Sequence, residues 1–160
     1  MTRATRWVIP VVLLVASLAH AEDFKKYEGE WFDIKYPASF TVKPQQESAS
    51  GPGVDAVSFL SPDGLVEFYV YSPQWSGEPR WIHRRPGEVQ TSYSRETARS
   101  RTIIYVTRQG PDYTRSYADY SDAMCGTRWV FGYKYKNQAA YSKYRSRYLT
   151  FKQSLQQYAD

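Results

Sequence analysis

The stretch VDAVSFLSPDGLVEFYVY, residues 54–71, decides the fold predicted for this chain. Two runs of β-prone residues flank the turn sequence Ser61-Pro62-Asp63-Gly64. Pro62 presets the φ of the first turn residue and Gly64 accepts the positive φ that closes the turn, so we expect a β-hairpin. The second run is apolar on one face and aromatic on the other, which is typical of a strand covered on both sides. We therefore place it in the middle of a sheet.

Extended structure is also predicted before the hairpin. Residues 31–36 alternate in polarity, Pro37 ends the run, and Phe40-Thr41-Val42 resumes it. This pattern indicates an opening hairpin or a bent strand. Residues 44–53 are polar and rich in Gln, Ser, Gly and Pro, so they are interpreted as a surface loop.

Residues 89–136 are predicted to form a β-meander. Tyr and Thr recur with period 2 in four runs, which begin near Val89, Thr102, Tyr113 and Trp129. Such enrichment is typical of a half-buried antiparallel sheet. With the hairpin, the pattern predicts a sheet of about five to seven strands.

The last segment changes period and is predicted to be an amphipathic helix. Its apolar residues are spaced 3, 4, 3, 4 and 3 apart, and they are Tyr141, Tyr144, Tyr148, Phe151, Leu155 and Tyr158. Asn137 is a suitable N-cap for this helix. We expect the stripe to pack across the sheet as core, so the predicted fold class is α+β.

The N-terminus has the three parts of a secretory signal peptide. Arg3 and Arg6 precede an apolar run, and Ala19-His20-Ala21 matches a small-x-small cleavage site. The alternative is an uncleaved membrane anchor, but the run is shorter than the about 20 apolar residues that a bilayer requires. We therefore expect residues 1–21 to be removed and residues 22–160 to form one domain, periplasmic or secreted, without a transmembrane segment.

Composition argues against several partners. Without Arg3 and Arg6, 19 basic residues face 16 acidic ones, a net charge of +3. This balance is too weak to indicate nucleic-acid binding.

The single cysteine, Cys125, has no partner cysteine in the chain. Its neighbours Met124 and Trp129 favour a buried thiol.

Three segments resemble the PsbP-like family of small exported domains. They are the opening Trp31-Phe32-Asp33-Ile34-Lys35-Tyr36-Pro37, the hairpin strands Val57–Phe59 and Val66–Val70, and the ending Tyr144–Leu155 with Phe151-Lys152-Gln153-Ser154-Leu155. The resemblance covers most of residues 22–160 and rests on hydrophobic patterns. It implies an α/β/α sandwich and a non-enzymatic accessory role, and it transfers no site residue. Residues 22–29 are a candidate for a short covering helix.

Catalytic chemistry finds little support in the sequence. A zinc site needs three or four Cys, His or carboxylate ligands, and residues 22–160 offer only His83 and Cys125 as nitrogen and sulfur donors. No phosphate-binding glycine loop or nucleophile elbow occurs, so no cofactor, metal or catalytic residue is predicted. An unrecognised hydrolase would have to use His83 as its base.

Residues 73–88 form the one segment that suggests binding. Prolines and glycines prevent regular structure there, and loops of this length in compact domains are often functional. Trp and Arg are enriched at binding hot spots. The candidate binding residues are Trp75, Arg80, Trp81, His83, Arg84 and Arg85. The opposing interpretation is a solvated basic loop whose Trp81 folds back on the sheet.

Three functions are compatible with this pattern. The first is a non-catalytic envelope module that binds a partner protein. The second is a binder of anionic glycans or lipid head groups through residues 73–88. The third is the hydrolase based on His83.

Overall fold

The computed structural model of this chain describes residues 23–75 and 77–158. Strands hold 52% and helices 14% of the described residues, so the fold is mainly β. The predicted α+β class is therefore wrong, although its antiparallel sheet is confirmed. The predicted signal peptide, residues 1–21, lies outside the described residues.

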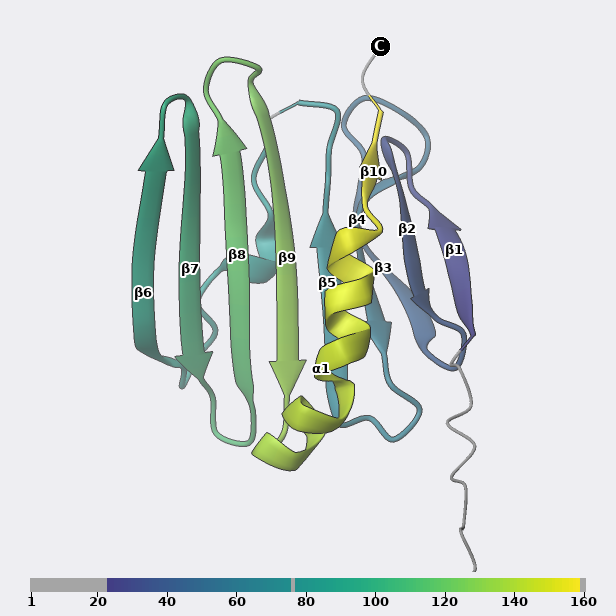
Figure 1. Cartoon of the computed structure of the whole chain (residues 1–160), viewed down its shortest axis with the longest axis vertical. Coiled ribbons are helices and arrows are strands. Elements are labelled where there is room, and N and C mark those ends of the chain that lie inside the picture. Colours follow the sequence, from purple (N-terminus) through teal and green to yellow (C-terminus); the bar gives the residue numbers. More distant parts are fainter. Residues whose placement is uncertain (1–22, 76, 159–160) are drawn as a thin grey trace, which may run out of the picture.

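Seven antiparallel strands form the main sheet (Figure 1). In spatial order they are β3 (Thr41–Glu47), β4 (Val54–Leu60), β5 (Val66–Tyr71), β9 (Thr127–Tyr135), β8 (Thr114–Asp122), β7 (Arg101–Gln109) and β6 (Val89–Ala98). The second hairpin strand, β5, is interior as predicted, and β9 takes the central position. The pairing of β5 with β9 joins the first hairpin to the meander β6–β9.

The hairpin turn forms as the sequence predicts. Gly64 has a φ of +67°, and its amide donates to the Ser61 carbonyl at 2.9 Å. Asp63 accepts hydrogen bonds at Oδ1 from the Ser61 hydroxyl at 2.6 Å and the Leu65 amide at 3.1 Å. Its Oδ2 accepts from the Tyr144 hydroxyl at 2.8 Å. One turn residue therefore fixes both the hairpin and the position of the C-terminal helix.

A second, three-stranded sheet replaces the helical layer that the PsbP-like resemblance implied. Its spatial order is β1 (Phe24–Glu28), β2 (Phe32–Pro37) and β10 (Gln156–Gln157), all antiparallel. Residues 22–29 were a candidate helix, but residues 24–28 of this segment form strand β1, which pairs with β2 along its whole length. The pairing with β2 satisfies the backbone of β1 in an extended conformation, and the Tyr27 ring meets the Phe59 ring edge-on with the centroids 5.7 Å apart.

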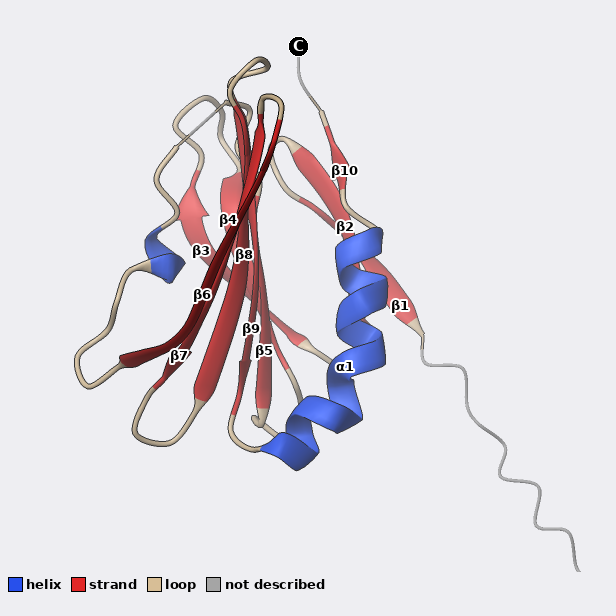
Figure 2. Cartoon of the chain, turned by 60° about the vertical axis from the view of Figure 1, so that its left-hand side comes forward, coloured by secondary structure: helices blue, strands red, loops and turns tan. Residues whose placement is uncertain are grey.

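The predicted helix is confirmed as α1 (Gln138–Gln153). The Asn137 side chain caps it by accepting from the Ala140 amide at 2.9 Å. The helix ends at Ser154, so Leu155 and Tyr158 of the predicted stripe lie beyond it. Figure 2 shows α1 on one side of the main sheet and the short 3₁₀ helix η1 (Arg80–Ile82) on the other.

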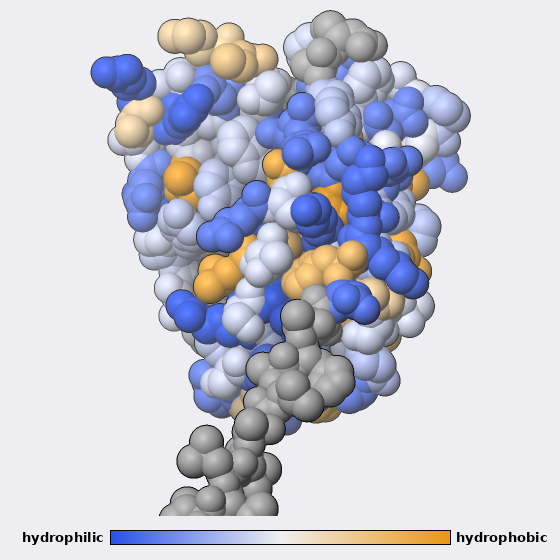
Figure 3. Space-filling view, turned by 45° about the vertical axis from the view of Figure 1, so that its right-hand side comes forward, coloured by the Kyte–Doolittle hydropathy of each residue, from blue (hydrophilic) through white to orange (hydrophobic). Residues whose placement is uncertain are grey.

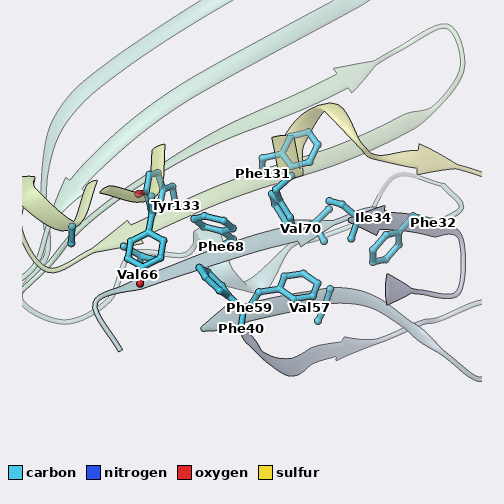
Figure 4. Packing of buried hydrophobic residues seen from close by; sticks show 13 residues of the cluster. Phe32, Ile34, Phe40, Val57, Phe59, Val66, Phe68, Val70, Phe131 and Tyr133 are labelled. Atoms are coloured by element: carbon cyan, nitrogen blue, oxygen red, sulfur yellow. The ribbon is translucent and has the colours of Figure 1, made fainter. Parts of the chain in front are cut away.

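The larger core lies between α1, the small sheet and one face of the main sheet (Figure 4). Phe68 is fully buried there, with ring centroids 5.0 Å from Phe40, 5.3 Å from Tyr133 and 5.4 Å from Phe151. The outer surface over α1 and the small sheet is mostly hydrophilic, with small separate hydrophobic patches (Figure 3).

Two local predictions are wrong. Pro44 was placed in a surface loop, but it lies within β3, where the pairing with β4 is irregular. Proline is tolerated there because β3 is an edge strand with a free side. Cys125 was expected to be buried, but it is exposed in the turn between β8 and β9. Among the described residues, no helix has the length and apolarity needed to cross a membrane.

The helix should depend on Phe151. Its side chain is fully buried and contacts the rings of Phe59, Phe68 and Phe131. Phe151→Ala should lower the free energy of unfolding by about 3–5 kcal/mol, measured by urea denaturation. The exposed neighbour Thr150→Ala should change it by less than about 0.5 kcal/mol. Equal effects of the two changes would contradict this packing.

Candidate functional site

The loop that connects β5 to β6, residues 72–88, crosses the face of the main sheet opposite α1. Its η1 turn places Trp81 against the sheet, where the indole stacks on Tyr69 at 4.9 Å with 9° between the planes. The indole Nε1 donates to Glu67 Oε1 at 3.1 Å. Gly132 makes this approach possible, because a Cβ there would lie 2.5 Å from the Trp81 ring. The folded-back position of Trp81 that the sequence allowed is therefore the observed one.

A buried ion pair fixes the end of this loop. Glu88 and Arg115 are both fully buried, and Arg115 donates to Glu88 Oε1 at 2.5 Å and to Oε2 at 2.6 Å. The same guanidinium donates to the backbone carbonyls of Trp81 and His83. Tyr113 adds a hydroxyl bond to Glu88 Oε1 at 2.8 Å. The Arg115 side chain of β8 thus donates to backbone carbonyls that the irregular loop would otherwise leave without a hydrogen-bond partner.

The electrostatics of Glu88 follow from these contacts. Burial alone would raise the pKa of the Glu88 carboxyl, but hydrogen bonds from Arg115, from the Arg85 amide and from Tyr113 outweigh it and lower the pKa to about 2. Glu88 is therefore an anion at neutral pH.

Two of the predicted binding arginines, the exposed Arg84 and the partly exposed Arg85, contact this ion pair or the Trp81 ring. The Arg84 Nε donates to the Glu88 carbonyl at 2.9 Å, and the Arg85 amide donates to Glu88 Oε2 at 2.9 Å. The Arg85 guanidinium lies 5.8 Å from the Trp81 ring centroid. Trp81, Arg84 and Arg85 therefore hold the loop on the sheet. The sequence could not separate this role from ligand binding.

The other predicted residues, Trp75, Arg80 and His83, line a cleft of about 410 Å³. The cleft lies between the first half of the loop and the ends of β3, β4 and β5. Trp75 is exposed at 52%, and His83 Nε2 lies 2.9 Å from Glu78 Oε1, also at the surface. The structure thus brings together half of the predicted set, and these residues form the candidate site.

Asp55 is the most unusual group in the cleft. Its side chain is only 4% exposed, and its Oδ1 has no hydrogen-bond partner among the described residues. Burial raises the pKa of the Asp55 carboxyl above its ordinary value, and hydrogen bonds from the Ser48 hydroxyl and the Ala49 backbone act in the opposite direction. A buried oxygen without a donor is costly to the fold, so it suggests that a ligand supplies the donor.

Tyr71 lines the cleft with Asp55 and is influenced by both the Asp55 carboxyl and the Arg128 guanidinium. Burial, reinforced by the negative charge of Asp55, raises the pKa of Tyr71 to about 12, so its hydroxyl stays neutral. Arg128 is held by Asp119, with Nη2 2.7 Å from Oδ2, and donates to the Gly77 carbonyl at 2.7 Å. This contact fixes the loop segment on one side of the cleft.

Comparison of the sequence with models of known protein families finds no match, and comparison with curated proteins finds no similar one. The resemblance to the PsbP-like family therefore stays a prediction.

Metal-binding or nucleophilic groups in and around the cleft would indicate catalytic chemistry. Within residues 23–75 and 77–158, no cluster of three or more His, Cys, Asp or Glu residues could hold a metal ion. The imidazole of His83 makes its one hydrogen bond in this part of the chain to Glu78, and no hydroxyl or thiol joins it. Asp55, Tyr71 and Glu78 were not among the site residues predicted from the sequence. An acidic residue inside the apolar run of residues 54–60 was the one available signal for Asp55.

The buried ion pair predicts a specific pH dependence. Because the folded pKa of Glu88 lies below its ordinary value of 4.5, the stabilisation is complete above pH about 4.5 and is lost as the pH falls toward 2. The loss should reach about 3 kcal/mol in urea denaturation at stepped pH values.

Glu88→Gln should be less stable than the parent at pH 7 and should lack this acid-dependent component. Glu96→Gln, which removes an exposed carboxylate from β6, should keep the parent profile. If Glu88→Gln and the parent lose stability in parallel between pH 4.5 and 2, the assignment is wrong.

Proposed function

We propose that this chain is an exported, non-catalytic accessory module that binds a partner protein, and that its cleft receives a basic side chain of that partner. The Asp55 carboxyl carries the proposal: it lines the cleft and has no ion-pair partner among the described residues, so a lysine ammonium or an arginine guanidinium would supply a charge-assisted donor. Export is inferred from the signal peptide predicted at residues 1–21.

The charges around the cleft favour a cation over an anion. Glu47 and Asp55 line it, and neither forms an ion pair within the described residues. Glu78 contacts His83 at 2.9 Å and lies 3.6 Å from Arg128, so its charge is already balanced. Arg80 is the remaining positive group of the lining. The exposed Trp75 adds a ring face that can attract a cation.

An anionic glycan or a lipid head group is a poorer occupant of this loop. That interpretation needs Trp81, Arg84 and Arg85 at the surface together, but only the two arginines are accessible there, because the Trp81 ring is buried against Tyr69. An anion in the cleft would also meet the carboxylates of Glu47 and Asp55, which repel it.

A hydrolase is likewise less well supported. A nucleophile activated by His83 should lie within hydrogen-bond reach of the imidazole, whose contact is instead with Glu78. Cys125 lies in the turn between β8 and β9, on a different part of the chain from the cleft residues.

Asp55 should decide whether the cleft binds a basic side chain. In titrations of the ¹⁵N-labelled chain with trilysine and triarginine at pH 7, amide shifts should change at Tyr71 and Trp75. Trimeric glutamate should cause no change. Asp55→Asn should weaken the binding at least tenfold, because the charge-assisted bond is lost. Its thermal stability should not fall, because the change removes a buried and incompletely satisfied charge.

Asp112→Asn, in the exposed turn between β7 and β8, serves as the matched control and should bind like the parent. Because burial raises the pKa of Asp55, binding by the parent should also decline on acidification above the pH where an ordinary aspartate protonates. Equal binding by Asp55→Asn and the parent would refute the site.

A further inference from the structure

The α1-facing side of the main sheet is only half covered. Helix α1 lies in front of β5 and β9, and the small sheet lies beside it, whereas no element lies over β6, β7 and β8 on this side in the described chain (Figures 1 and 2). A groove of about 270 Å³ follows the seam between α1 and the uncovered strands. It is on the opposite side of the sheet from the loop with Trp81.

The floor of the groove is polar and its wall is aromatic. On the floor, the hydroxyls of Thr107 in β7 and Ser116 in β8 lie 2.9 Å apart. Tyr141 and Tyr148 of α1 and Tyr105 of β7 line the sides, and all three are partly exposed. The groove therefore combines ring faces with hydroxyl groups, which can both accept and donate hydrogen bonds.

Among the described residues that line the groove, two are positively charged and none is negatively charged. Arg145 and Lys152 lie on the same flank of α1, two helical turns or about 10 Å apart along its axis. Within the described residues neither forms an ion pair with a carboxylate. The Lys152 ammonium lies 5.6 Å from the Phe131 ring centroid and 5.9 Å from that of Tyr148. Burial lowers the pKa of Lys152 because it disfavours the charged ammonium. An anion bound beside the ammonium would offset this free-energy cost.

We propose that this groove binds an acidic saccharide, with its sugar rings against Tyr105 and Tyr148 and its carboxylates on Arg145 and Lys152. Two cations two turns apart suit a ligand with repeated negative charges better than a single small anion. The tyrosine rings and the Thr107–Ser116 pair favour a sugar over an acidic peptide, because a sugar presents an apolar C–H face together with many hydroxyl groups. This site does not depend on the Asp55 cleft.

The probe is tetragalacturonate, titrated into the chain by isothermal calorimetry at low salt. We expect binding that weakens steeply as salt is added, because the exposed charges become screened. Lys152→Met, which keeps the apolar stem, and the exposed Arg145→Gln should each weaken the binding about tenfold. Lys43→Met, which removes an exposed positive charge from β3, should bind like the parent. Maltotetraose, which lacks charge, should bind at least tenfold more weakly.

Three results would overturn the proposal. The first is binding of tetraglutamate as tight as that of tetragalacturonate, which would make the groove a site for acidic peptides. The second is a tetragalacturonate titration with no heat change and no amide shifts at Tyr105 or Tyr148. The third is an equal affinity of the parent and of Arg145→Gln, whose exposed side chain was replaced and whose fold is checked by its melting temperature.

Discussion

The buried pair of Glu88 and Arg115 is the interaction on which the rest of this structure depends. Residues 72–88 contain too many prolines and glycines to form a helix or a strand, yet they must cover one face of a seven-stranded sheet. Arg115 resolves this conflict, because it binds the Glu88 carboxylate and two loop carbonyls at once. The loop can then be irregular and fixed at the same time, and its first half closes the Asp55 cleft.

The two faces of the main sheet are covered by different physical means. On the α1 side, phenylalanine and tyrosine rings pack in a continuous core that excludes water. On the loop side, a smaller core around Tyr69 and Trp81 is surrounded by ion pairs such as Arg128 with Asp119. Polar contacts are directional, and they hold groups at defined positions around the cleft. The proposed protein-binding site therefore lies on the face of the sheet where ion pairs, as well as packed rings, fix the positions of the side chains.

Sequence patterns predicted the features that depend on neighbouring residues. The turn at Asp63 and Gly64, the meander and the cap at Asn137 each follow from a few adjacent side chains. The features that were missed depend on distant pairing. Strand β1 is extended because β2 lies beside it. The sequence allowed two positions for Trp81, and the buried one is adopted because Gly132, far along the chain, leaves room for its ring. Asp55 lies in an apolar run, and its missing donor becomes visible only when the surrounding segments are in place.

The pairing of β5 with β9 has a consequence for how the chain reaches its native state. Tyr71 pairs with Val130, about sixty residues later, whereas β6 to β9 are joined by short turns. Closing so long a loop costs conformational entropy before any contact compensates for it. The pairing of β5 with β9 should therefore form late, after the meander. Pulsed hydrogen exchange during refolding should find β7–β8 amides protected before those shared by β5 and β9. A partly folded chain, with the meander formed, would then expose the unpaired edge of β9. Aggregation should be most favoured at that stage.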